Sequence, residues 1–114
     1  MDVLLIFKII AAIATVLTGL LSLFKPDAVY DFTGLKVVGG RGITEVRSIF
    51  GGLFIALGAV PLYFRSQETF FMLGMTYLAI ALVRFVSMFL DNSVMKSNFI
   101  SLATEIVFGL ILIA

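Results

Sequence analysis

Four long apolar segments, at residues 3–24, 45–64, 68–90 and 98–114, constrain the fold of this chain more than any other feature. A helix needs about 20 mainly apolar residues to cross the hydrocarbon core of a bilayer. The first three segments reach this length, and the shorter fourth segment is expected to need local thinning of the bilayer. The sequence therefore predicts an all-α integral membrane four-helix bundle that forms a single domain over residues 1–114.

Composition supports a membrane environment. Hydrophobic residues make up 61% of the 114 positions, whereas a soluble domain is about 45–50% apolar. A chain of this size has too much surface to hide the excess from water. The first segment is expected to be a span and not a cleaved signal peptide, because Asp2 is acidic and the apolar run to Phe24 exceeds the usual h-region of about 7–15 residues.

The chain lacks the residues on which several functions depend. It has no cysteine and no histidine, which excludes disulfides, iron–sulfur clusters, histidine-ligated haem and the usual zinc sites. The net charge is +1, with no basic stripe for nucleic acid. No catalytic residue, no metal site and no nucleic-acid partner are predicted. A bound lipid or quinone is the only non-protein group that the sequence suggests.

The connections carry turn signals. Pro26 is expected to start a short interfacial helix. Gly39-Gly40-Arg41-Gly42 indicates a flexible loop or, as a sharper interpretation, a backbone nest for an anionic head group. Thr44 is the predicted N-cap of the second span, and Ser66 or Gln67 precedes the third.

The distribution of basic residues predicts an orientation. The connections 25–44 and 91–97 lie on one side of the membrane if the four segments alternate in direction. That side holds Lys25, Lys36, Arg41 and Lys96. The other side holds Arg65 and Lys8, the latter with a long stem that can snorkel to the interface. The positive-inside rule then places both connections in the cytoplasm and both termini outside.

Four charges lie inside the predicted spans: Glu45, Arg47, Arg84 and Glu105. At a rise of 1.5 Å per residue, all four fall within about 10 Å of the same membrane face. One unpaired charge in hydrocarbon costs roughly 2.5–3.5 kcal/mol. Two acidic and two basic residues therefore predict cross-helix pairing. Glu45 with Arg84 and Arg47 with Glu105 is one arrangement, and the sequence leaves the choice of pairs open.

Polar and small residues surround these charges. The polar residues on the expected faces are Tyr77, Ser87, Asp91 and Ser101, and the expected helix-packing glycines are Gly19, Gly51, Gly52 and Gly58. One interpretation is a network that only fixes the helix register. Another is a binding site for an anionic or polar head with arginine as its anchor, and a third is proton or ion coupling through Glu105.

The run Glu45-Val46-Arg47-Ser48-Ile49-Phe50-Gly51-Gly52 resembles the E-x-R-x-x-x-G-G signature of small bacterial four-helix membrane proteins in the DoxX-like group, within a domain-of-unknown-function family. Gly19, the Phe24-Lys25-Pro26 segment, Arg84 with Asp91, and Glu105 are also similar to that family. Asn92 stands where the family usually has glycine, and asparagine also adopts left-handed turns. The resemblance implies an inner-membrane protein without an established biochemical activity, and it supplies no catalytic residues.

These observations favour a non-enzymatic protein. We expect either an accessory subunit of a larger membrane complex or a binder of a lipophilic ligand with a polar head, as a homo-oligomer or within that complex. The alternative is a small ion- or proton-coupled transporter or channel that acts as an oligomer. A lipid-modifying enzyme with Glu45 or Glu105 as its base ranks third, because no metal cluster or nucleophile–base pair accompanies either carboxylate.

Overall fold

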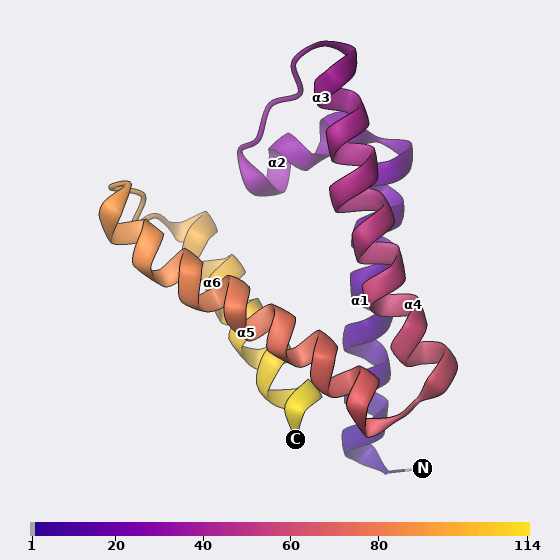
Figure 1. Cartoon of the computed structure of the whole chain (residues 1–114). Helices are drawn as coiled ribbons and strands as arrows, with labels where there is room; N and C mark the ends of the chain where they lie inside the picture. Colours follow the sequence, from indigo (N-terminus) through magenta and orange to yellow (C-terminus); the bar gives the residue numbers. More distant parts are fainter. Residues whose placement is uncertain (1) are drawn as a thin grey trace. The chain divides into compact units, whose positions relative to one another are not determined.

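The protein is all-α (Figure 1). The computed structural model describes residues 2–114, and these contain helices, turns and connections but no β-strand. The elements in chain order are α1 (Val3–Phe24), η1 (Pro26–Ala28), α2 (Val29–Thr33), α3 (Gly39–Glu45), η2 (Val46–Leu53), α4 (Phe54–Phe64), α5 (Gln67–Leu90) and α6 (Lys96–Ile113).

Four helices are long and apolar enough to cross a membrane: α1, the continuous helix Gly39–Phe64 formed by α3, η2 and α4, then α5 and α6. Only 22–28% of the residues in their apolar windows are buried inside the protein. Most of their apolar side chains therefore face outward. This is expected when lipid surrounds a helix, whereas a water-soluble protein buries such side chains in its core. These features are those of an integral membrane protein, and the prediction of four long apolar helices is confirmed.

The chain divides into two compact units. One contains residues 9–63. The other contains the N-terminal residues up to Lys8 together with residues 64–114, so α1 begins in one unit and continues in the other. The division into two compact units does not test whether the chain is a single domain, so the single domain over residues 1–114 remains a prediction.

In the unit of residues 9–63, α1 approaches the helix Gly39–Phe64 at glycine positions. A Cβ added at Gly19 would lie 2.8 Å from the carbonyl oxygen of Gly51, and one at Gly58 would lie 2.5 Å from the carbonyl oxygen of Ala12. Only glycine allows the two backbones to come this close. Gly52 takes no part in this contact, because no atom lies within 4 Å of the position its Cβ would occupy.

The second span begins at Gly39, six residues earlier than the sequence predicts. The prediction of a flexible loop at residues 39–42 is therefore wrong. These residues form the start of α3 after Val38, which has an extended backbone. Thr44 is not the N-cap, since its hydroxyl donates to the carbonyl oxygen of Gly40 within the helix at 3.0 Å. An ion pair between Arg41 and Glu45, four residues apart, supports this turn against the low helix propensity of its glycines.

Val46–Leu53 is π-helical, a wider winding in which N–H groups bond to carbonyls five residues back. This segment contains most of the E-x-R-x-x-x-G-G run. Helices of this kind are rare, and short π-helical turns occur frequently at functional sites.

In the other unit, α5 and α6 form a helical hairpin (Figure 1). Gly74 and Gly109 lie at their contact, where a Cβ on Gly74 would lie 3.0 Å from the carbonyl oxygen of Gly109. Ala81, Met88 and Leu102 form a buried apolar cluster in this hairpin.

The ends of the hairpin helices follow local signals. Ser66 caps α5 by accepting a hydrogen bond from the backbone N–H of Thr69 at 3.3 Å, so this cap is confirmed. Asn92 in the connecting turn has a left-handed φ of 52°. The helix α6 begins at Lys96, two residues before the predicted start, with Met95 in an extended conformation ahead of it.

Candidate functional site

The charges in the hairpin form one internal ion pair, between Arg84 of α5 and Glu105 of α6. The Arg84 Nε donates to Glu105 Oε1 at 2.9 Å and to Oε2 at 3.1 Å, and Nη2 donates to Oε2 at 2.8 Å. The side chains are 30% and 10% exposed. A guanidinium and a carboxylate in this fork-like arrangement make a strong charge-assisted contact.

Asn98 extends this contact toward the turn. Its side-chain oxygen accepts from Arg84 Nη1 at 3.0 Å, and its amide nitrogen donates to the carbonyl oxygen of Ser93 at 2.9 Å. We call Arg84, Glu105, Asn98 and Ser93 the ion-pair network. All three nitrogen atoms of the guanidinium thus have acceptors within the protein, and two of its five N–H groups remain without one in the ion-pair network.

The pairings considered from the sequence are wrong for Arg84 and Glu105, which pair with each other. The reason is topology: α5 and α6 are joined by a short turn, so their polar faces meet within the hairpin. Glu45 pairs instead with Arg41 on the surface of α3, at 3.0 Å and with side-chain exposures of 54% and 86%. Arg47 is exposed on η2 and forms no ion pair with any of residues 2–114.

The other predicted polar residues lie outside the ion-pair network. Tyr77 stacks edge-on against Phe108, with ring centroids 5.5 Å apart. Asp91 is exposed at the end of α5, and Ser87 and Ser101 are half-buried. Asn98 shares the polar face of α6 with Ser101 and Glu105, and its side chain reaches both Arg84 and the turn.

A first cavity lies where the connection before α3 meets α3 and η2. Its volume is about 290 Å³. The residues that line it are Leu35, Lys36, Val37, Gly42, Glu45, Val46, Ile49 and Phe50, and we call it the loop cavity. It combines apolar walls with one cationic and one anionic side chain, and it includes Glu45 from the predicted site.

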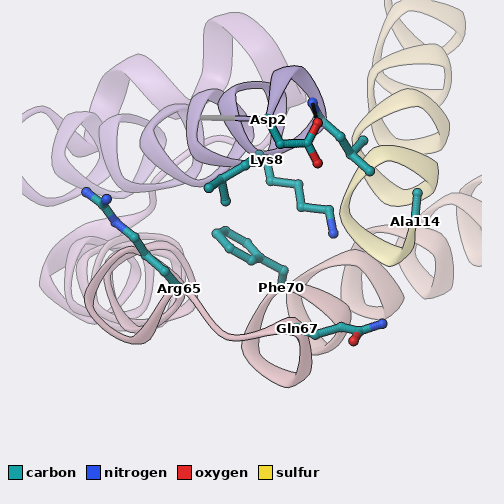
Figure 2. Close-up of a pocket in the computed structure, with 8 residues that line it drawn as sticks. Asp2, Lys8, Arg65, Gln67, Phe70 and Ala114 are labelled. Atoms are coloured by element: carbon teal, nitrogen blue, oxygen red, sulfur yellow. Dashed lines mark hydrogen bonds between the residues drawn. The ribbon is translucent and has the colours of Figure 1, made fainter.

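A second cavity, of about 390 Å³, lies in the other unit (Figure 2). Its lining residues are Asp2, Leu4, Leu5, Lys8, Arg65, Gln67, Phe70 and Ala114, and we call it the Lys8 cavity. Lys8 is only 9% exposed. Its ammonium lies 5.8 Å from the centre of the Phe70 ring, and no residue among 2–114 accepts a hydrogen bond from it or forms an ion pair with it.

Lys8 is buried within the protein and does not extend along its outer surface as a snorkelling lysine would, and the sequence contained a signal for this burial. Lys8 precedes Ala11, Ala12, Thr15 and Ser22 at helical spacing, and all of these are buried on α1. Small residues at that spacing mark the packed face of a membrane helix. A lysine in register with them is expected to point inward.

Within residues 2–114 no group of three or more histidine, cysteine, aspartate or glutamate side chains could hold a metal ion. When the chain is compared with models of protein families, with curated proteins and with solved structures, nothing matches.

Proposed function

We propose that this chain is a non-enzymatic membrane protein that binds a lipophilic molecule with a polar head, such as a lipid or a quinone. The observation that carries this proposal is the loop cavity. Ligand sites are mostly apolar pockets of about 300–1,000 Å³ with a few polar groups. The loop cavity, at about 290 Å³, is large enough for a head and the first part of its tail.

The lining supports an amphiphile. Val46, Ile49 and Phe50 supply apolar walls from η2, while Lys36 lies on the connection and has no polar partner among residues 2–114. A tail would contact the walls, and Lys36 would meet an anionic or carbonyl oxygen of the head. The carboxylate of Glu45 is already held by Arg41.

The test is co-purification in mild detergent, followed by native mass spectrometry and titration with phosphatidylethanolamine and a short-chain quinone. Ile49→Gln places an amide on the apolar wall. Burial of an isoleucine side chain is worth about 1.5–3 kcal/mol, so we expect retention of the bound amphiphile to weaken about tenfold or more.

Leu53→Gln is the matched control. Leu53 lies one turn further along the same helix and is 48% exposed, against 50% for Ile49, but it does not line the loop cavity. Lys36→Gln is compared in the same way with Lys25→Gln, which removes an exposed charge away from the loop cavity. Equal retention by Ile49→Gln, Leu53→Gln and the unchanged protein would refute the proposal.

A second candidate function, an accessory subunit of a membrane complex or a homo-oligomer, is favoured by Arg47. This arginine is exposed within the second membrane-spanning helix and has no ion pair among residues 2–114. A carboxylate of a partner chain would neutralise it. Chemical cross-linking in membranes is expected to capture a partner or a second copy, and Arg47→Gln is expected to abolish that product. An unchanged cross-linking pattern would exclude this role for Arg47.

A transporter or channel is disfavoured by the ion-pair network. Glu105 accepts three hydrogen bonds from Arg84, so both of its carboxylate oxygens are already occupied by a partner within the protein. Proton flux in liposomes that Glu105→Gln abolishes, without loss of folded protein, would reverse this ranking.

The proposal also includes membership of the DoxX-like group and insertion in the bacterial inner membrane, with connections 25–44 and 91–97 in the cytoplasm and both termini outside. Since the chain has no cysteine, single substitutions Lys36→Cys and Gln67→Cys report the orientation directly. An impermeant thiol reagent applied from outside should label the second and not the first. The opposite labelling would invert the orientation.

A further inference from the structure

We propose that the Lys8 cavity binds the anionic phosphate head group of a membrane lipid, with the Lys8 ammonium as its counter-ion. This site is separate from the loop cavity and does not depend on the function proposed for it. All residues that line the Lys8 cavity belong to a single compact unit.

The first argument is charge. Lys8 is 9% exposed and has neither a carboxylate nor a hydrogen-bond acceptor among residues 2–114. Buried charges are otherwise paired, because an isolated ion loses its hydration without compensation. The Phe70 ring, at 5.8 Å, offsets only part of that loss. An anion beside the ammonium would complete the pair.

The second argument is the shape and lining of the cavity. Figure 2 shows the Lys8 side chain extended over Phe70, with its ammonium directed toward the last turn of α6 at Ala114. Leu4 and Leu5 add apolar walls, and Gln67 can donate from its amide. A volume of about 390 Å³ holds a head group but not its acyl chains, which would run outside along the helices.

The remaining charges favour a single negative charge on the ligand. The carboxylate of Asp2 accepts from the backbone N–H of Leu4 at 3.1 Å and so caps the start of α1. Arg65 lines the cavity, but its guanidinium points away from Lys8 (Figure 2). Lys8 is then the cation whose charged end lies in the cavity, and one phosphodiester group would balance that single charge.

The third argument is depth. Lys8 is five residues after the start of α1, or about 8 Å along the helix axis. The cavity also includes Gln67, the first residue of α5. The ends of membrane-spanning helices lie near the head groups, so phospholipid phosphate is the most abundant anion at this level. This favours a lipid over a free phosphate ion.

The test uses the full chain in phosphatidylcholine nanodiscs with increasing phosphatidylglycerol, and native mass spectrometry as the readout. We expect the unchanged protein to retain one phosphatidylglycerol molecule. Lys8→Gln should weaken retention about tenfold or more, the loss expected for one charge-assisted hydrogen bond. Lys8→Arg should keep most of it. Lys96→Gln, which removes an exposed charge at the opposite end of α6, should leave retention unchanged.

Two further arms keep the outcome decisive. Leu5→Trp narrows the cavity while Lys8 keeps its charge, and it too should abolish retention, so the test survives if Lys8→Gln fails to fold. Inorganic phosphate should not displace the lipid, and displacement at millimolar concentrations would overturn the assignment to a lipid. Equal retention by Lys8→Gln, Lys96→Gln and the unchanged protein would overturn the site itself.

Discussion

Two cations in the same compact unit, Arg84 and Lys8, are both placed inside membrane-spanning helices but differ in what surrounds them. Arg84 has Glu105 and Asn98 as acceptors. Lys8 is more deeply buried and lines a cavity, and among residues 2–114 it forms a cation–π contact with Phe70 but no ion pair and no hydrogen bond. A charge that the protein itself neutralises contributes to the fold, whereas a charge left without a partner costs stability until a ligand supplies one.

The largest expected effect comes from breaking the paired cation. Arg84→Leu leaves the carboxylate of Glu105 buried without a counter-ion, and such changes cost about 3–5 kcal/mol. Steric-trap measurements of the free energy of unfolding in bicelles should show this loss. Lys36→Leu, on an exposed connection, should change stability by less than about 0.5 kcal/mol. Adding Glu105→Leu to Arg84→Leu should restore most of the loss, and a double variant as unstable as Arg84→Leu would contradict the pairing.

A smaller effect is expected from Asn98→Ala, which removes the acceptor of the Arg84 Nη1 hydrogen bond. Hydrogen bonds to charged groups are worth about 1.5–3 kcal/mol. Ser101→Ala is the control, because Ser101 is also half-buried on α6 but has no partner in the ion-pair network. If both variants unfold at the same temperature as the unchanged protein, Asn98 is not part of the network in the membrane.

The contact between Lys8 and Phe70 can be isolated with a double-mutant cycle of Lys8→Met and Phe70→Leu. Cation–π contacts are worth about 0.5–2 kcal/mol. The cost of Phe70→Leu should therefore be smaller by that amount when Lys8 is already methionine. Strictly additive costs in thermal unfolding would show that the ring does not stabilise the ammonium.

The smallest effect is expected at the exposed ion pair. Arg41 and Glu45 are 86% and 54% exposed, and surface pairs four residues apart on a helix contribute about 0.3–0.5 kcal/mol. Arg41→Ala should therefore change the free energy of unfolding by no more than that, and high salt should remove the difference. A loss as large as that of Asn98→Ala would mean that this pair is buried in an assembly.

The sequence was sufficient to predict features that depend on a single local signal, such as the ends of helices. A short helix starts at Pro26 after the first span ends at Phe24, as predicted, and Ser66, one of the two residues expected before the third span, is its cap. The need for a partner at Arg84 also followed from the cost of a charge in hydrocarbon. The identity of that partner did not, because two carboxylates, Glu45 and Glu105, lay at similar predicted depth and helix rise alone does not say which faces meet.

Other features of the fold depend on opposing energetic effects, and a sequence pattern does not show which of these effects is larger. Four residues with three glycines indicated a loop at 39–42, yet they form the first turn of a helix that continues into η2, and the Arg41–Glu45 ion pair offsets part of their low propensity. No sequence rule indicated the π-helical winding of Val46–Leu53. Lys8 shares a helical stripe with the buried residues Ala12 and Thr15, which predicts that it points inward, whereas its long stem near a helix end predicts snorkelling.

The most direct test of the contrast between the two cations is to remove each charge with the same residue in the same zwitterionic detergent. Arg84→Met and Lys8→Met are each compared with the unchanged protein by thermal unfolding, without anionic lipid. The difference in partners predicts opposite signs: Arg84→Met lowers the Tm, and Lys8→Met raises it because a buried, unpaired charge is removed. A lower Tm in both variants would show that Lys8 already has a partner within the protein and would contradict the account.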